Sequence, residues 1–461
     1  MDINYQYVTP QLYRRIREYR EEFHRYPECG WTEYRTSWRI ADRLTELGFE
    51  VFAGESVCGS GTGMGIPEEE SAQEYEQRAC TEGVPKEVLA QMRGGRTGVV
   101  GVLRGSRKDT GDEHRGDRTY AGDRDCEAES GENAEQVIAF RFDIDALPIQ
   151  EERTVYNASY RSLHEGVMHA CGHDGHAAVG LGLAEILSQY RNQIDGEIRL
   201  IFQPAEEGCR GAQPIAESGL LNSTDIFLSG HIVPAAQYPQ ITGDFIVTDG
   251  SFATTKIDVT YYGKSAHAAH PEDGRSVMPG TGCLLTRLYA LMDTKNEDTV
   301  LNVGTLSAGT GRNILADQAH MEIEVRGKTT EKNMQLTEAV LAIIQDTAQA
   351  YGLQKDVKIV GSAPSLKSTQ SLTEELYHLF SDKSLPVQSS SLKTTAFMAS
   401  EDAAHLMEAV KNHGGQAAYL LFPAHTSAVL HQPDYTFDEA VLSKAVEVYC
   451  RTALHFFGKT R

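Results

Sequence analysis

Strand-like and helix-like stretches alternate along much of this chain, and that alternation limits its fold more than any other feature. Apolar runs at 97–105 and 136–149 have the character of strands in a buried sheet. A helical pattern follows at 177–192, and strand-like segments return at 196–208 and 225–233. Strands that alternate with helices predict an α/β domain built in layers.

The pattern changes near Gly250. Residues 251–364 read as strand, helix, two strands, helix and strand, a βαββαβ order that is typical of a self-contained two-layer α+β domain. The remainder of the chain is again mixed. The sequence therefore predicts a three-layer α/β domain with a mixed central sheet, formed by residues 1–250 and 365–461. The smaller domain at 251–364 is inserted into it.

One segment cannot contribute to a core. Between Leu103 and Val137 the chain has no Val, Ile, Leu, Met, Phe or Trp. A stretch without large apolar side chains cannot bury enough surface to order itself. We therefore expect a disordered insertion at 106–136.

Composition excludes some classes of function. The formal net charge of −22 disfavours binding to nucleic acids and to anionic membranes, because both reward a basic surface. The amino terminus lacks the apolar core of a signal peptide, and no run approaches the roughly 20 apolar residues of a membrane span. The eight cysteines are scattered without a CxxC pair or a disulfide-like spacing, which favours reduced thiols and a cytoplasmic location.

The chemistry concentrates in "VMHACGHDGHAA", residues 167–178. Cys171 and His173 flank a single glycine, which suits a tight loop that turns both side chains toward one ion. A thiolate and an imidazole are good ligands for Zn²⁺, and imidazole also suits Mn²⁺. No second Cys/His pair of this kind occurs, so the remaining ligands must come from distant residues. That arrangement is typical of catalytic metals.

Three further places offer such ligands. Glu206 and Glu207 follow an apolar strand, His231 lies beside a glycine at the end of another, and His431 lies near the carboxy terminus. Strand ends are where open α/β sheets bind ligands. Of two adjacent carboxylates, one can bind a metal while the other transfers protons. Taken singly, a histidine is more often an ordinary core or surface group, and a Glu-Glu pair is more often solvated.

Several motifs together resemble one family. "FRFDIDALPI", "GVMHACGHDGHAA", "LIFQPAEEGCRGA", "SGHIV", "GKSAHAA" and "GRNILAD" occur in the order seen in metal-dependent aminoacylases and amidohydrolases of the peptidase type. This family includes hippurate hydrolases and indoleacetyl-amino-acid hydrolases. Residues 63–101 are similar to an extra helical segment of its aminobenzoyl-glutamate hydrolase subgroup.

The resemblance implies roles for individual residues. It implies two divalent metal ions, Mn or Zn, and makes Glu206 the general base. In such enzymes the inserted domain forms a dimer. Its "SAHA" histidine, here His267, is implied to be catalytic, because it reaches a neighbouring subunit's site and stabilises the oxyanion. Asn313 and Arg326 match residues that hold the substrate's carboxylate or carbonyl. The metal ligands that the resemblance implies are Cys171, His173, Glu207, His231 and His431.

The predicted function is hydrolysis of the amide bond of N-acyl amino acids, with aminobenzoyl-glutamate-like substrates preferred. A metal ion suits this reaction because it lowers the pKa of a bound water toward about 7. Two alternatives stay open: a dipeptidase or deacetylase of the same fold, and a non-catalytic metal-binding homologue. The expected partners are the small-molecule substrate and a second copy of the chain, or a related subunit in a heteromer.

Overall fold

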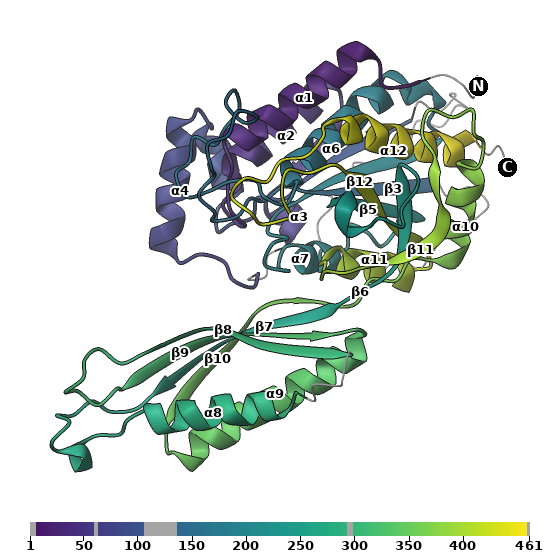
Figure 1. Ribbon diagram of the computed structural model, residues 1–461. Helices are drawn as coiled ribbons and strands as arrows, with labels where there is room; N and C mark the ends of the chain where they lie inside the picture. Colours follow the sequence, from purple (N-terminus) through teal and green to yellow (C-terminus); the bar gives the residue numbers. More distant parts are fainter. Residues whose placement is uncertain (1–5, 60–62, 106–135, 293–297, 459–461) are drawn as a thin grey trace.

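The computed structural model describes residues 6–59, 63–105, 136–292 and 298–458. Apart from Gln136, the insertion expected at 106–136 lies outside the described residues. A larger domain contains an eight-stranded sheet, and a smaller one contains a four-stranded sheet (Figure 1). The larger sheet has the order β1-β2-β4-β3-β5-β12-β6-β11. Its strands are β1 (Glu50–Ala53), β2 (Val99–Arg104), β3 (Gln136–Asp143), β4 (Gly196–Gln203), β5 (Ile226–Pro234), β6 (Phe245–Ser251), β11 (Ser389–Phe397) and β12 (Gln416–Ala424).

The centre of this sheet is parallel, and its edges are mixed. Strands β4, β3, β5 and β12 run parallel to one another, whereas β2 pairs antiparallel with β4 and β6 pairs antiparallel with β12. Side chains of β3 alternate between two cores: Ile138 and Phe140 pack on one face and Ala139 on the other. This explains the continuous apolar runs in the sequence, because both faces of the central strands are covered. The strand predicted over 136–149 ends at Asp143.

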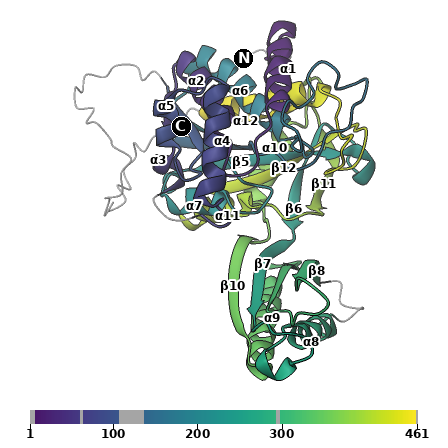
Figure 2. The same ribbon diagram turned by 90° about the vertical axis from the view of Figure 1, so that its left-hand side faces the viewer.

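Helices cover both faces and complete the three layers (Figures 1 and 2). One face carries α1 (Pro10–Arg25), α2 (Tyr34–Glu46), α6 (His173–Gln189), α10 (Gln370–Leu379) and α12 (Ala440–Gly458). The other carries α3 (Glu55–Cys58), α7 (Ala212–Glu217) and α11 (Ala403–Asn412). Helices α4 (Glu69–Thr81) and α5 (Lys86–Gln91) lie in the segment that resembles the subgroup's extra helices, and α4 packs against α2.

The smaller domain is a two-layer unit. Its sheet has the order β10-β7-β9-β8 with antiparallel neighbours, and α8 and α9 pack on one face over a separate core. The chain order is βαββαβ, so the predicted fold class is confirmed for both domains. The elements are β7 (Ala253–Tyr262), α8 (Met278–Ala290), β8 (Thr299–Ala308), β9 (Gln318–Gly327), α9 (Thr330–Ala350) and β10 (Gln354–Ala363).

The two domains meet at the amino-terminal end of β7 (Figure 1). The chain enters the smaller domain after β6 and returns through β10, whose Ser362 N–H donates to Cys209 O at 2.9 Å. The Tyr262 end of β7 lies at the opposite end of the smaller domain. Short 3₁₀ turns occupy Arg191–Gln193, Ala235–Gln237 and Pro271–Asp273. Among the helices of the described residues, none combines the length and apolarity that crossing a membrane requires.

Candidate metal centre

The "HACGHD" segment forms a turn that leads directly into α6. Gly172 lies between Cys171 and His173 with φ of 95°, a left-handed conformation that favours glycine. This turn presents both flanking side chains to one buried place. Cys171 Sγ lies 3.4 Å from His231 Nε2. The sequence expectation of a tight loop is thus confirmed in its geometry.

The two glutamates follow β4 in a second turn. Ala205, just before them, has a φ of 52°, a conformation that side-chain-bearing residues rarely adopt outside functional or tightly held sites. Glu206 Oε2 lies 3.9 Å and Glu207 Oε1 lies 4.0 Å from His173 Nε2. Both carboxylates therefore face the Cys171–His173 turn.

Two histidines from distant parts of the chain complete the cluster. His231 lies within β5, opposite Leu421 of β12, rather than at the strand's end as the sequence suggested. His431 lies in the loop before α12 with φ of 66°, and its N–H donates to Ala170 O at 2.8 Å. Its Nε2 is 3.4 Å from Glu207 Oε2.

The donor set fits two cations. Cys171, His173 and His231 form one group, and Cys171, Glu207 and His431 form another, each with ligand atoms within 4.8 Å of one another. His173 Nε2 and Glu207 Oε1 are buried and have no hydrogen-bond partner among the residues that the structure describes. Buried polar atoms normally have partners, so these atoms lack one that a metal would supply. Cys171 belongs to both groups, so both candidate ion positions would lie beside its sulfur.

Residues that the sequence did not single out orient these ligands. His173 Nδ1–H donates to Asp145, at 3.0 Å from its backbone oxygen and 3.2 Å from Oδ1, which leaves Nε2 to face the cluster. Asp145 Oδ2 accepts from Glu207 N–H at 2.9 Å. Asp143 binds His176 Nδ1, and His176 Nε2 accepts from Ile232 N–H at 2.9 Å, beside His231. The spacing in "FDID" was a usable signal, since it puts both aspartates on one side of an extended chain.

A buried ionic network lies behind Glu206. Arg141 lies 2.7 Å from Asp143, 3.0 Å from Glu401 and 3.1 Å from Asp402, and all four are nearly inaccessible. No motif in the sequence marks Glu401 or Asp402. They reach Glu206 because the segment before α11 packs against the end of β4, where Asp402 accepts from Gln203 Nε2 at 2.8 Å.

Burial and neighbouring carboxylates shift the pKa values of the clustered side chains. Burial and the carboxylates of Glu401 and Asp402 raise the pKa of Glu206 well above its usual range. Burial raises the pKa of Glu207 to about 7. Burial lowers the pKa of His231, so its imidazole is neutral and able to ligate. Bound cations would offset the repulsion among these acids.

His267, predicted to be catalytic, and Asn313 and Arg326, predicted to bind substrate, lie outside this cluster. His267 is exposed in the loop after β7, where it bridges to Ile314, and Ala268 N–H donates to Asn313 O at 3.0 Å. This loop lies at the end of the smaller domain remote from the larger one. Arg326 is on β9 opposite Thr254, near the other end, and pairs with Glu324 at 2.9 Å.

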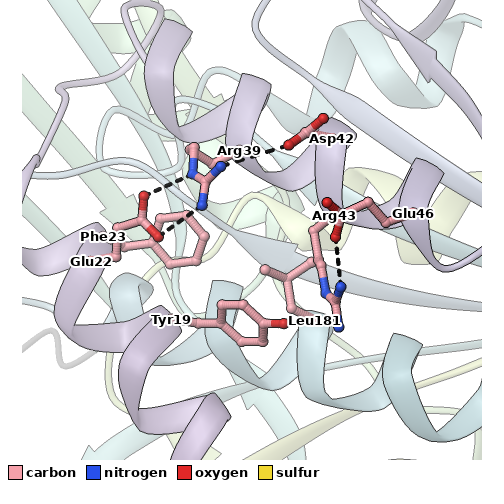
Figure 3. Close-up of a pocket in the computed structure, with 8 residues that line it drawn as sticks. All are labelled: Tyr19, Glu22, Phe23, Arg39, Asp42, Arg43, Glu46 and Leu181. Carbon is pink, nitrogen blue, oxygen red and sulfur yellow. Dashed lines mark hydrogen bonds and ion pairs between the residues drawn. The ribbon is translucent and has the colours of Figure 1, made fainter. Parts of the chain in front are cut away.

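A separate small hollow on the surface involves α1, α2 and α6 (Figure 3). Its charges pair with one another: Arg39 lies 2.8 Å from Glu22, and Arg43 lies 2.6 Å from Glu46. None of its lining residues belongs to the ligand groups described above. We assign no function to it.

Comparison with known proteins agrees with this geometry. The model of peptidase family M20/M25/M40 matches residues 139–455, more than half of the chain. The chain belongs to this family. It is 35% identical over 450 residues to a p-aminobenzoyl-glutamate hydrolase subunit of Escherichia coli strain K12, covering 96% of each chain. It is 34% identical over 458 residues to indole-3-acetyl-aspartic acid hydrolase of Enterobacter agglomerans, covering 97% of each.

A solved structure supports the same assignment. The chain matches that of an aminobenzoyl-glutamate utilization protein from Klebsiella pneumoniae with a TM-score of 0.75 and 29% identity, over 96% of each chain. The expected family resemblance is confirmed. With the ligand groups described above, family membership makes this protein a metal-dependent amidohydrolase.

Proposed function

We propose that this hydrolase cleaves the amide bond of N-acyl amino acids whose amino acid is acidic, such as aminobenzoyl-glutamate or indoleacetyl-aspartate. The observation that carries the proposal is the pair of ligand groups that share Cys171, with Glu206 beside them. The acidic leaving group is suggested by the relatives with full-length similarity. Cys171, His173, Glu207, His231 and His431 would hold two divalent ions, with Mn²⁺ and Zn²⁺ the candidates because the S, N and O donors suit both.

Each residue then has a chemical task. Bound divalent ions would lower the pKa of a water molecule toward neutrality and polarise the scissile carbonyl. Glu206 takes a proton from the attacking water and passes it to the leaving amine. His267 of a second copy donates to the developing oxyanion, a contribution of about 3 kcal/mol for one such donor. Asn313 of the second copy, which lies in the same loop region as His267, and Arg326 of the first chain hold the substrate's carboxylate or carbonyl.

Metal removal tests the centre directly. Dialysis of the protein against a chelator should abolish hydrolysis of aminobenzoyl-glutamate, and Mn²⁺ or Zn²⁺ should restore it, because the nucleophile depends on the ions. Metal analysis at each step should find two ions per chain in the active form. Full activity in metal-free protein would refute the proposal.

A substrate panel tests specificity. The reloaded enzyme should hydrolyse aminobenzoyl-glutamate and indoleacetyl-aspartate in preference to N-acetyl-cysteine and free dipeptides. Preference for either of the latter would favour the deacetylase or dipeptidase alternative, and a relative named N-acetyl-L-cysteine deacetylase, 30% identical over 322 residues, makes that comparison necessary. Activity only after addition of a second, related chain would favour a heteromer over the homodimer that we propose.

A further inference from the structure

The loop between α1 and α2 lies directly behind the turn that carries Glu206 and Glu207. We propose that Glu33, in this loop, is a positioning residue: its carboxyl group holds the strained Ala205 and so sets where the two glutamates point. The inference deepens the proposed function and rests on it. Glu33 lies outside the part of the chain that matches the family model.

The contacts of Glu33 are specific. Its side chain is fully buried, and Oε1 accepts from the Ala205 N–H at 2.8 Å. Thr97 Oγ1 donates to Oε2 at 2.6 Å and fixes the orientation of the carboxyl group. Ala205 has a positive φ, which an L-residue retains only where its surroundings hold it. The Glu33 carboxyl group is therefore one of the constraints on the residue immediately before Glu206.

Other residues of the loop between α1 and α2 also lie close to Ala205 and Asp145. A Cβ added at Gly30 would lie 2.9 Å from Ala205 Cα and 3.4 Å from Asp145 Oδ2, so only glycine leaves room for this approach. Cys29 forms an isolated bridge with Ala146, next to Asp145. Asp145 in turn contacts His173 and the Glu207 N–H. The loop thus contacts both segments that orient the proposed ligands: the turn at Ala205 and the segment at Asp145 and Ala146.

The acid group can be replaced by a neutral one. Burial and the nearby Asp145 carboxylate raise the pKa of Glu33 well above its usual range. The carboxyl group acts on Ala205 through its Oε1 acceptor, so an uncharged side chain that keeps an acceptor oxygen is a close mimic. Glu33→Gln should keep the contact with Ala205, whereas Glu33→Met keeps the volume and removes the acceptor.

The same loop supplies a matched control. Glu28 is also fully buried, and its carboxylate accepts from the N–H groups of Arg35 and Thr36 at 3.1 and 2.8 Å. Thr36 Oγ1 donates to it at 2.9 Å, as Thr97 does to Glu33. The Glu28 side chain supports the start of α2 and not the turn at Ala205. Glu28→Met therefore removes a similar buried contact with no direct effect on Glu206.

The first readout is the split between kcat and KM. Displacing a catalytic group by about 1 Å can cost about 100-fold in rate. We expect Glu33→Met to lower kcat about 100-fold with KM within twofold, and Glu33→Gln to stay within threefold of wild type. Glu28→Met should stay within threefold in kcat even where it lowers the melting temperature. An equal loss of kcat in the two Met variants, or no rescue by Gln, would overturn the proposal.

The second readout does not depend on hydrolysis. Substitution with Co²⁺ gives a visible absorption spectrum that reports the geometry of the ligands. Glu33→Met should shift this spectrum, because Glu207 belongs to the same turn, whereas Glu33→Gln and Glu28→Met should leave it unchanged. If wild-type protein hydrolyses no acyl amino acid, the proposed function fails, and the spectrum still decides the role of Glu33. An unchanged spectrum in Glu33→Met refutes that role.

A milder pair serves if the Met variants do not fold. Thr97→Val removes the donor that orients Glu33, and Thr36→Val removes the equivalent donor to Glu28. Thr97→Val should lower kcat about threefold to tenfold and shift the Co²⁺ spectrum, while Thr36→Val changes neither. Equal behaviour of the two variants would overturn the proposal.

Discussion

Adjacent residues in this centre have different tasks because their surroundings differ. Glu207 has one oxygen 3.4 Å from His431 and another that is buried without a hydrogen bond in the described part of the chain. Glu206 instead faces the acidic pair Glu401 and Asp402, which with burial raises its pKa. The pKa of Glu207 is raised as well, so the pKa values do not separate the two roles. The difference lies in their partners: Glu207 lies beside His431 with one unpartnered oxygen, as suits the proposed ligand, and Glu206 lies beside it, as suits the proposed base.

Exchanging each carboxylate for an amide tests this division. Glu206→Gln should lower kcat about 10²–10⁴-fold, the usual contribution of a general base, and leave the metal content nearly unchanged. Glu207→Gln should lower the metal content itself. Both quantities are measured on the same preparations by kinetics and elemental analysis. If Glu206→Gln lost metal and Glu207→Gln kept it, the two assignments would have to be exchanged.

At the scale of elements, a buried ion pair joins α1 to α6 beside the metal centre. Arg20 Nε lies 2.9 Å and His24 Nδ1 lies 2.8 Å from Asp174 Oδ2, and all three side chains are about 1% exposed. Arg20 and His24 lower the pKa of Asp174 well below its usual range, although burial alone would raise it. The pair connects the first helix to the helix that begins at His173.

Removing the Asp174 charge should therefore destabilise the protein. Asp174→Asn should lower the free energy of unfolding by about 3 kcal/mol, the lower end of the range for a broken buried pair, because Arg20 keeps Glu439 at 3.1 Å as its remaining counter-charge. Asp42→Asn, which removes an exposed partner of Arg39 at 3.7 Å, is the control and should cost less than about 1 kcal/mol. Denaturant unfolding of the chelated proteins measures both. Similar small losses in the two variants would show that the pair contributes little.

The same ion pair predicts a dependence on pH. The pKa of Asp174 is lower in the folded state than its unfolded value of about 3.9, so its contribution is present above that pH and declines as the pH falls. The difference in unfolding free energy between wild type and Asp174→Asn should shrink by about 1 kcal/mol from pH 5 to pH 3. A constant difference would contradict the depressed pKa.

Two neighbouring strand ends suggest that the segment at 106–135 can be replaced. Arg104 at the end of β2 and Gln136 at the start of β3 both pair with the first residues of β4. The two residues lie at the same end of the sheet's strands, with only β4 between them, about 10 Å apart. A linker of about six Gly and Ser residues spans that distance.

Replacing 106–135 with such a linker should leave melting temperature and kcat within error. The reason is compositional, because the segment has no large aliphatic side chain to add to a core. Differential scanning calorimetry and the aminobenzoyl-glutamate assay measure the two properties. A large loss of either would mean that the segment contacts the rest of the protein or a partner.

On the scale of the whole molecule, the separation of His267 from the metal centre matters most. His267 lies beyond the Tyr262 end of β7, and the larger domain meets the opposite end of that strand (Figure 1). A strand of ten residues spans about 33 Å. If His267 acts in catalysis, it is therefore suited to serve the centre of a second copy.

Mixing two inactive variants tests shared centres. Glu206→Gln subunits mixed with His267→Ala subunits should regain activity, because each hybrid dimer contains one centre with both residues intact. The recovered kcat should approach half of the wild-type value per hybrid. Subunit exchange is verified separately with fluorescently labelled protein. No recovery despite exchange, or a monomer at assay concentration, would refute a shared centre.

The sequence by itself determined the fold class, the order of elements in the smaller domain and the cluster of ligand-type side chains. These follow from short-range patterns: apolar runs, helical periodicity, and the Cys171–Gly172–His173 spacing, which favours a tight turn. Local geometry depends on neighbouring residues, so such features can be read without knowing the rest of the chain.

Only the tertiary structure decided which distant groups support the centre. Glu33 binds Ala205 across 172 positions, and Arg141 binds Asp402 across 261. These contacts depend on the order of strands in the sheet, where β12 separates β5 from β6. They also depend on which loops emerge at the same end of the strands. A buried carboxyl group finds its partner by packing, and no local pattern encodes that choice. For the same reason His231 lies inside β5, since its neighbour β12 extends the pairing beyond it.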